Sequence, residues 1–531
     1  MAEPRQQVRV RMILTMCFLI LFFHQSWPAQ AGSLCVPRER DALLDFKAGL
    51  TDPTNSLSSS WRGTECCRWT GVVCSNRTGH VVTLQMHARH VGGEIRSSLL
   101  TLRYLKRLDL SGNDFGGEPI PELIGALGRG RLTHLDLSYS NFGGRIPPHL
   151  GNLSNLVSLK LEYMAHAIYS PDIAWVSRLT KLQLLRVSQV DLGAAIDWPR
   201  AINMLPCLME LDLRSCGLQN SMPSTMLPNL TSLETLTLDG NSFNTSLGAK
   251  SWVWDLPSLQ ELSLNSCGID GQLPDAVGKL TSIRKLSLAS NKFDGMVPLT
   301  LKNLKKLQRV DLSSNFINMD VAELLHRLPS YELQYLDLGQ NRLTGGVPVG
   351  IRELINLKGL SLTHNNLHGT ISQSIGELHA LESVDLSHNE ISGEIPTSIS
   401  ALTSLNLLDL SYNNLTGAIP TGNQLQALDD PMFIYIGNPG LCGSPLPRSC
   451  LRTDIIANAP GKHDRGMSDV LSLYLSMCIG FVAGLWIVFF GFLFKRRWRV
   501  GWFSFTDRMY NRAYVQVAVG WACLARKMSQ G

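Results

Sequence analysis

Cysteines offer the most reactive side chains in this sequence, and they are unevenly placed. The chain of 531 residues contains 12 of them. A thiol can serve as a nucleophile, as a metal ligand or as one half of a disulfide. Six lie at the two ends of a long repetitive region: Cys35, Cys66, Cys67, Cys74, Cys442 and Cys450. Because cysteines at both ends of such a region suit covalent caps, we expect disulfides there and no catalytic thiol.

The lengths of the loops suggest how the first group pairs. A bridge between Cys67 and Cys74 closes a short loop, and Cys35 then pairs with Cys66. Four cysteines allow three pairings, so the sequence leaves the other two open.

Enzymatic chemistry has no support in the motifs of the chain. The sequence contains no H-E-x-x-H metal site, no G-x-S-x-G elbow, no Walker loop and no glycine loop of a kinase. A cysteine protease would use Cys207 or Cys216, but no organised base accompanies either thiol. We therefore expect a protein that is not an enzyme and that needs no metal or cofactor.

Binding chemistry is better represented, in a group of charged, amide and aromatic side chains. We predict these residues at exposed positions of successive strands: Lys160, Glu162, Tyr163, Arg186, Gln189, Glu210, Arg214, Asp239 and Asn265. Tyr and Arg concentrate binding energy at interfaces. The group predicts a ligand-binding surface, and solvated side chains on irregular repeats are the alternative.

A repeat of 24 to 27 residues positions these side chains. Its pattern, L-x-x-L-x-L-x-x-N-x-L with other aliphatic residues allowed, occurs fourteen times. The copies begin at Val81, Leu105, Leu132, Leu156, Leu182, Leu208, Leu233, Leu259, Ile283, Leu307, Leu333, Leu357, Leu381 and Leu405. Alternation in L-x-x-L-x-L is typical of a short strand with one buried face. We therefore predict a leucine-rich-repeat solenoid, an α/β-type superhelix with a parallel concave sheet.

The Asn of the repeat has a structural role. Its amide group can bond the backbone of adjacent coils, which burial would otherwise leave without partners. Eight copies contain it: Asn113, Asn241, Asn291, Asn315, Asn341, Asn365, Asn389 and Asn413. Met164 and Val190 replace it in two copies. Cys216 and Cys267 replace it in two others, where we expect buried thiols and no redox site.

A stack of coils exposes an apolar cross-section at each end, which needs a cover. We assign residues 32–80 to an N-terminal cap, 81–428 to the repeats, and 429–450 to a C-terminal cap with a Cys442–Cys450 bridge. In the first cap, residues 38–50 space Leu43, Leu44 and Phe46 like the apolar face of an amphipathic helix.

Both termini predict an extracellular protein with a membrane anchor. Residues 1–31 combine basic residues, a short apolar run and a small-x-small cleavage motif, as a signal peptide does. An uncleaved anchor is the alternative, but its apolar run is short for a span. Residues 470–494 are long enough to cross a bilayer, and the basic segment 495–531 after them favours the cytoplasmic side. We expect a single-pass type I protein of the plasma membrane, with residues 451–469 outside.

Two further motifs fit this location. Five N-x-[S/T] sequons suit a glycosylated surface: Asn76, Asn152, Asn229, Asn244 and Asn414. Within the predicted span, Gly480 and Gly484 form G-x-x-x-G, and Gly491 lies two turns further on. Small residues at this spacing let a second helix approach closely. The glycines therefore predict a packing surface for another membrane helix, with tolerated glycines as the alternative.

Three motifs of the chain occur together. They are the C-x-W-x-G-V-x-C cap at 67–74, the G-x-I-P endings of several repeats, and GNPGLCG-x-PL-x-x-C at 437–450. In combination they resemble plant leucine-rich-repeat receptor-like proteins, in particular the group of receptors for ethylene-inducing xylanase. The resemblance implies a right-handed, twisted superhelix with a second strand on one flank. It also implies an adaptor receptor kinase that binds the transmembrane helix through such glycines.

The resemblance further implies a leucine-rich-repeat co-receptor kinase near the membrane-proximal repeats. The residues that would face it are Thr363, His364, His388 and Tyr412. Because His364 and His388 lie one coil apart, such an interface could respond to apoplastic pH. Larger members of the family interrupt the repeats with an island segment, and no interval here has room for one. The chain is therefore expected to be a short paralogue or a truncated gene model.

These observations predict a cell-surface receptor. It would bind an extracellular protein, peptide or glycan, with a microbial elicitor as the expected ligand, and signal in defence through partner receptor kinases. A non-signalling inhibitor or decoy that binds secreted microbial enzymes is one alternative, and a developmental peptide receptor is another. Nothing in the sequence suggests a nucleic-acid partner.

Overall fold

The structure of the protein is a computed structural model that describes most of residues 35–450. The gaps are 165–166, 220–228, 244–245 and 429–430. Outside the described residues lie the predicted signal peptide (1–31), the segment 451–469, the span 470–494 with Gly480, Gly484 and Gly491, and the tail 495–531. No helix in the described part is long and apolar enough to cross a membrane.

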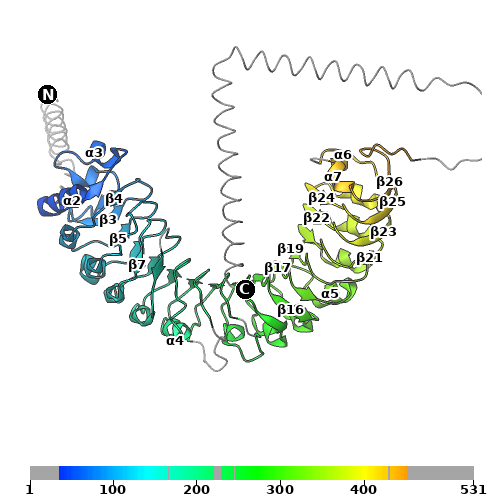
Figure 1. The fold of residues 1–531 in the computed structure, drawn as a ribbon, viewed down its shortest axis with the longest axis horizontal. Coiled ribbons are helices and arrows are strands. Elements are labelled where there is room, and N and C mark those ends of the chain that lie inside the picture. The colour runs from blue at the N-terminus through cyan, green and yellow to red at the C-terminus, as the bar shows by residue number, and fades with distance from the viewer. Residues whose placement is uncertain (1–34, 165–166, 220–228, 244–245, 429–430, 451–531) are drawn as a thin grey trace, which may run out of the picture. The chain divides into compact units, whose positions relative to one another are not determined.

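The repeats build one sheet of 15 strands on the concave face of the solenoid (Figure 1). The aliphatic positions point into the core, and Leu336 and Leu338 are buried as predicted. Neighbouring strands are parallel and in register, so Leu336 lies opposite Leu360. The first strand is an exception, because it comes from the cap and pairs antiparallel with the second. In order, the strands are β2 (Val72–Cys74), β3 (Val81–Gln85), β5 (Arg107–Asp109), β6 (His134–Asp136), β8 (Ser158–Lys160), β10 (Leu184–Arg186), β11 (Glu210–Asp212), β12 (Thr235–Thr237), β13 (Glu261–Ser263), β15 (Lys285–Ser287), β17 (Arg309–Asp311), β19 (Tyr335–Asp337), β20 (Gly359–Ser361), β22 (Ser383–Asp385) and β24 (Leu407–Asp409).

Short helices form the convex side, and most are single 3₁₀ turns. Proline fixes φ near about −65° and has no N–H, so it suits the start of a helical turn. The I-P endings use this property, since Pro147 and Pro396 precede two of the turns. The 3₁₀ helices are η1 (Cys66–Arg68), η2 (Ser97–Thr101), η3 (Glu122–Gly130, interrupted at Leu127), η4 (Pro148–Asn152), η5 (Ala174–Arg178), η6 (Trp252–Asp255), η7 (Asp275–Lys279), η8 (Leu299–Asn303), η9 (Val349–Glu353), η10 (Gln373–Glu377) and η11 (Thr397–Ala401). The α-helices are α2 (Pro37–Gly49), α3 (Ser56–Ser60), α4 (Trp198–Asn203), α5 (Val321–Arg327), α6 (Asn423–Gln426) and α7 (Pro431–Tyr435).

A second set of short strands follows the main strands in several coils. Among the described residues they form four small sheets. The members are β1 (Leu50–Thr51) with β4 (Gly92–Gly93); β7 (Gly144–Arg145) with β9 (Ile168–Tyr169); β14 (Asp270–Gln272), β16 (Lys292–Gly295) and β18 (Phe316–Ile317); and β21 (His368–Gly369), β23 (Glu390–Glu394), β25 (Asn414–Ala418) and β26 (Gly440–Cys442). The second strand implied by the resemblance is therefore present in part of the stack.

Where the repeat contains its Asn, the side chain bonds the backbone of two coils, as predicted. Asn291 is representative and is buried. Its Nδ2 donates to the carbonyl oxygens of Leu264 (2.7 Å) and Leu288 (3.0 Å). Its Oδ1 accepts from the amides of Cys267 (3.0 Å) and Ile269 (3.1 Å). One side chain thus bonds four buried backbone groups, which explains why an amide recurs at this position.

The ladder of Asn residues also has members that the sequence pattern missed. Asn438, in the predicted C-terminal cap, accepts from the amide of Leu415 and donates to the oxygen of Leu410. The repeat geometry therefore continues one coil beyond Asn413. In an earlier coil Ser140 takes the Asn position, and its hydroxyl donates to the same oxygen of Leu110 that Asn113 bonds.

Cys216 and Cys267 are buried thiols, as predicted. Their Sγ atoms donate to the carbonyl oxygens of Val187 (2.7 Å) and Leu238 (3.2 Å). Burial raises the pKa of both thiols to about 12. Because a thiol reacts as its thiolate, both groups are inert at physiological pH.

Disulfides close both caps in the predicted pairing. The pairs are Cys35–Cys66, Cys67–Cys74 and Cys442–Cys450. Three sulfur atoms of the N-terminal cap lie within 4.8 Å of one another, but all three belong to disulfides and offer no thiolate to a metal.

The helix of the N-terminal cap, α2, covers the first coil. Leu43 and Phe46 are fully buried as predicted. The expectation for Leu44 was wrong, because its side chain is 39% exposed. Successive residues of an α-helix are rotated by about 100°, so Leu44 leaves the face that Leu43 shares with Phe46.

Candidate ligand-binding surface

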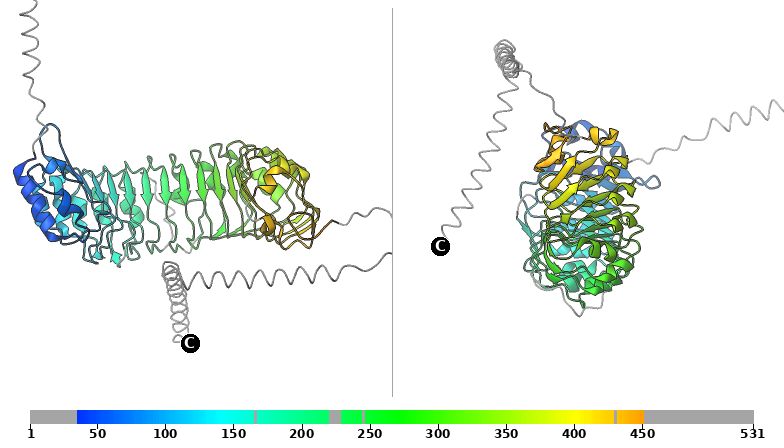
Figure 2. Two further views of the ribbon diagram at one scale, coloured as in Figure 1. Left: turned by 90° about the horizontal axis from the view of Figure 1, so that it is seen from above. Right: turned by 90° about the vertical axis from the view of Figure 1, so that its right-hand side faces the viewer.

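The strands of the concave sheet lie side by side (Figure 2). Because they are in register, their exposed side chains form rows. The first row contains the first residue of each strand, and the second row contains the third residue. The third row lies two residues further along the chain. The residue after it has a positive φ in most coils, for example 54° at His388. We call this last set the left-handed row.

The predicted binding residues 160–265 lie together on β8 to β13, and five of them form a charged network. Lys160 pairs with Asp136 at 3.5 Å. Arg186 contacts Glu210 at 2.5 Å and Glu162 at 3.9 Å. Arg214 forms a two-pronged pair with Asp212, in which its Nε lies 2.9 Å from Oδ2.

The hydrogen-bonded carboxylates hold the two arginines in their charged form. The bond with Glu210 raises the pKa of Arg186, and the bond with Asp212 raises the pKa of Arg214. Glu162 is not the exposed residue that we expected, because only 7% of its surface is accessible. Burial raises the pKa of Glu162, and nearby Arg186 opposes this shift. The network therefore satisfies most of its own charge.

The other predicted residues of this surface continue the rows. Asp239 accepts from the amide of Asn265 and from the hydroxyl of Ser263, both at 2.7 Å. Tyr163 and Gln189 belong to the left-handed row. The ring of Tyr163 stacks on that of Tyr139 with centroids 4.8 Å apart.

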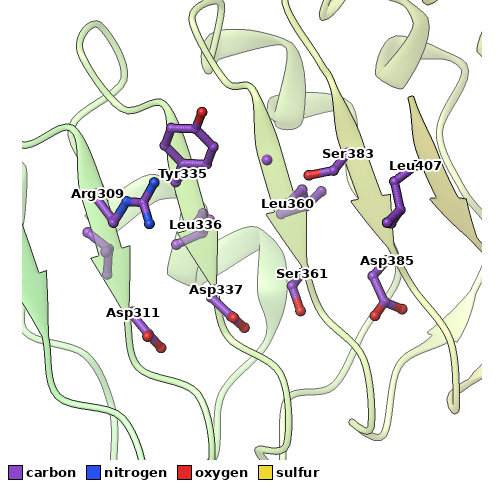
Figure 3. Close-up of a pocket in the computed structure, with 12 residues that line it drawn as sticks. Arg309, Asp311, Tyr335, Leu336, Asp337, Leu360, Ser361, Ser383, Asp385 and Leu407 are labelled. Carbon is purple, nitrogen blue, oxygen red and sulfur yellow. The ribbon is translucent and has the colours of Figure 1, made fainter. Parts of the chain in front are cut away.

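A hollow of about 300 Å³ opens in the same sheet at β17 to β24 (Figure 3). Arg309, Tyr335 and Leu407 stand along its first-row side. The guanidinium of Arg309 lies over the Tyr335 ring, 4.2 Å from its centroid. Leu407 is 54% exposed, which is unusual for leucine on the described sheet. This side of the hollow is therefore largely aromatic and aliphatic.

The absence of a side chain at Gly359 creates the space between Tyr335 and Ser383. These three residues are neighbours in the first row. A Cβ atom on Gly359 would lie 2.8 Å from Cδ1 of Tyr335 and 3.1 Å from Oγ of Ser383. Gly359 has no positive φ, so its backbone does not require glycine. The glycine is needed for space alone, and any larger residue would displace Tyr335 or fill the hollow.

Carboxylates line the second-row side of the hollow. Figure 3 shows Asp311, Asp337 and Asp385 in a line, with Ser361 in between. None of the three forms an ion pair with a residue that the structure describes. Burial raises the pKa of Asp337, and the charges of Asp311 and Asp385 add to this shift. The hollow thus combines an apolar side with an acidic side.

The four residues expected to face a co-receptor lie side by side at the C-terminal coils. Thr363 and Ser387 are hydrogen-bonded in the third row, with their hydroxyl oxygens 2.7 Å apart. His364, His388 and Tyr412 occupy consecutive positions of the left-handed row. Their exposed rings stack at centroid distances of 4.1 and 4.4 Å. The coils thus present a continuous aromatic strip beside the hollow.

Sequence reasoning missed the hollow, although a signal for it exists. The repeat pattern makes the regular coils look uniform, because most of them contain Asp at the second row. The segment L-K-G-L-S-L at 357–362 has Gly at a first-row position where adjacent coils have Tyr335 and Ser383. Comparing this position from coil to coil would have found it.

Four of the five predicted glycosylation sites are exposed in the structure: Asn76, Asn152, Asn229 and Asn414. Asn244 lies outside the described residues.

Matches to known families and folds agree with this architecture. Residues 36–75 match the leucine rich repeat N-terminal domain. Leucine rich repeats match residues 281–343, 355–415, 131–153, 258–280 and 101–118. The crystal structure of PEPR1-AtPEP1 superposes with a TM-score of 0.56 at 25% identity, over 72% of this chain and 56% of that chain. The fold is therefore a leucine-rich-repeat solenoid with a parallel sheet.

A second solved structure supports the fold alone. It is the leucine-rich-repeat ectodomain of the plant membrane receptor kinase GASSHO1/SCHENGEN3 from Arabidopsis thaliana, in complex with CASPARIAN STRIP INTEGRITY FACTOR 2. Its TM-score is 0.51 at 24% identity, over 68% of this chain and 47% of that chain.

The curated relatives of the chain are plant receptor-like proteins. Receptor-like protein EIX1 of Solanum lycopersicum is 38% identical over 269 residues, which are 47% of this chain and 25% of the relative. Receptor-like protein EIX2 of the same species is 37% identical over 263 residues, with the same coverage. The alignment thus spans about half of this chain and a quarter of those relatives. The resemblance stated from the sequence motifs is confirmed: the chain is a homologue of plant receptor-like proteins.

Proposed function

We propose that the protein is a cell-surface receptor that binds an extracellular protein, peptide or glycan on its concave sheet. The observation that carries this proposal is the hollow at β17 to β24, with its unpaired carboxylates. Many charged groups elsewhere on the sheet form ion pairs within the protein, whereas these carboxylates accept hydrogen bonds from their own coils but have no cationic partner among the described residues. Homology to receptor-like proteins supports the same role. The proposal includes no enzymatic activity.

The proposed location is the plasma membrane, in a single-pass type I orientation with the N-terminus outside. It rests on the predicted signal peptide and span, and the capped, disulfide-bonded solenoid suits an oxidising extracellular space. A microbial elicitor as ligand and a role in defence are part of the proposal through the family resemblance.

Signalling would pass through partner receptor kinases. An adaptor kinase would pack on the predicted span at Gly480, Gly484 and Gly491, where small residues allow close helix contact. A leucine-rich-repeat co-receptor would bind the aromatic strip of His364, His388 and Tyr412 with Thr363. Stacked, exposed rings suit such a contact because aromatic side chains bury large areas with little loss of side-chain entropy.

Co-immunoprecipitation from leaf membranes tests the signalling mechanism. The full-length chain is compared with a Gly480→Leu/Gly484→Leu variant, and bound kinases are identified by mass spectrometry. A Cys478→Leu/Val482→Leu variant places leucines at the same spacing on the opposite face of the expected helix and is the matched control. We expect wild type and the control to recover a receptor kinase, and the double variant to lose it.

If none of the three proteins recovers a kinase although all of them reach the plasma membrane, this result would contradict signalling through partner receptor kinases. The better interpretation would then be a non-signalling binder or decoy of secreted microbial enzymes. Recovery of the same kinase by all three would show that the glycines are not the contact.

A further inference from the structure

The size of the hollow limits what it can hold. Pockets that enclose a whole small ligand have volumes of about 300 to 1,000 Å³, and this hollow is at the lower limit and open to the groove. It suits one side chain of a longer ligand. The space over Gly359 lies between Tyr335 and Ser383, with Leu407 one strand further on, and it has room for one aliphatic side chain.

The charged residues around the hollow favour a positively charged group on the ligand. Asp337 and Asp385 stand on the second-row side with no ion-pair partner among the described residues. Arg309 is the cation of the lining, and it is already held over the Tyr335 ring. A positively charged ligand group would therefore gain carboxylate partners, whereas an anionic group would meet uncompensated negative charge.

The register of the strands sets a spacing for the ligand. Asp337 and Asp385 are two strands apart, across β19, β20 and β22. Strands lie about 4.8 Å apart, so the two carboxylates are separated by roughly 10 Å along the stack. A peptide in the polyproline II conformation advances about 3.1 Å per residue and completes one turn in three residues, so side chains three residues apart lie on the same side and are separated by about 9 Å.

We propose that this hollow is a subsite for an extended basic peptide segment that runs across the strands. Two Lys or Arg side chains, three residues apart, contact Asp337 and Asp385, and an aliphatic side chain between them occupies the space over Gly359. The inference rests on the receptor function proposed above and names the ligand class for its concave sheet.

Selection from a random phage-displayed peptide library tests the subsite. The target is the full-length chain purified in detergent, and selected peptides are synthesised and their Kd values measured by fluorescence polarisation. We expect enrichment of peptides with two basic residues three apart. For these peptides, Asp337→Asn/Asp385→Asn should weaken binding by about tenfold, because charge-assisted contacts are lost.

Matched control variants test whether removing charge or adding bulk affects Kd only at the hollow. Asp270→Asn/Asp294→Asn removes the same charge from exposed positions of β14 and β16 and should leave Kd unchanged. Gly359→Leu fills the hollow and should abolish binding. Gly350→Leu adds the same bulk where a Cβ meets no atom within 4 Å, and binding should persist. If Gly359→Leu fails to fold, as judged by circular dichroism, the carboxylate variants still decide the question.

Three results would overturn the subsite: no enrichment of any peptide, enrichment of neutral or acidic peptides, or unchanged Kd in the Asp337→Asn/Asp385→Asn variant. If one of these results refutes the subsite but a receptor kinase is still recovered from membranes, the proposed receptor role remains. Binding of basic peptides as predicted, with no kinase recovered, would support the subsite and contradict the signalling mechanism.

Discussion

At the scale of single residues, the buried Asn side chains and the partly buried carboxylates of the hollow have opposite effects on stability. Each Asn of the ladder supplies hydrogen bonds that the coil cannot make by itself. Asp337, in contrast, is a partly buried charge that the fold tolerates without a cationic partner among the described residues. The first kind of residue maintains the fold, and in the proposed subsite the second would keep a charge for a ligand at some cost in stability.

Replacing Asn291 with Ala tests the ladder. Loss of its side-chain amide leaves the oxygen of Leu264 and the backbone amides of Cys267 and Ile269 without partners, whereas the oxygen of Leu288 still accepts from Asn315. We expect the free energy of unfolding to fall by about 3 kcal/mol, because each unsatisfied buried group is costly. Urea denaturation followed by circular dichroism measures it. Asn303→Ala, at an exposed position, is the control, and equal midpoints for the two variants would refute the structural role.

Replacing Asp337 with Asn should change stability in the other direction. Its pKa is raised in the folded state, so the fold binds this proton more readily than the unfolded chain does. The charged form therefore destabilises the protein at neutral pH, and this effect disappears as pH falls below the raised pKa. We expect the variant to melt higher than wild type at pH 7.5, by about 2 °C.

The difference in Tm between the Asp337→Asn variant and wild type should vanish on acidification, once the wild-type carboxyl is protonated. Thermal melts at a series of pH values measure it. A variant that melts lower than wild type at neutral pH would mean that the carboxylate is structural and not held for a ligand.

At the scale of elements, each coil contacts mainly its neighbours, so damage to one end should remain local. The disulfide between Cys67 and Cys74 ties β2 to the loop before it. Replacing both cysteines with Ser should cost about 2 kcal/mol for so short a loop. Hydrogen–deuterium exchange should then show faster exchange in β2 and β3, with β22 and β24 unchanged. Equal loss of protection in all four strands would contradict local stability.

Much of the element level follows from periodicity alone. The strands, the Asn ladder and the three disulfides could be predicted, because each depends on residue types at a fixed spacing. The exposure of Leu44 also follows from helix periodicity, since a helix rotates Leu44 off the face that Leu43 shares with Phe46. The burial of Glu162 could not be predicted, since it depends on tertiary packing. The role of Asn438 in the ladder was not predicted, because its coil lacks the other leucines of the pattern. The hollow depends on an omitted side chain, which a search for reactive groups overlooks.

At the scale of the whole solenoid, the charged network on β8 to β11 and the hollow on β17 to β24 lie on one continuous sheet. Neither surface uses residues of the other, and the coils between them follow the regular repeat. The two surfaces are therefore fixed by the same register but are separately alterable.

The register of the strands has a consequence for how such a receptor changes over generations. Duplication or loss of one whole coil, such as residues 283–306, would preserve every hydrogen bond type while moving the two surfaces by one strand spacing, about 4.8 Å. Unequal crossing-over between repeats could thus lengthen or shorten the distance between the two surfaces that a ligand must span. New specificities would arise in discrete steps, without any new fold and without a single change inside either contact surface.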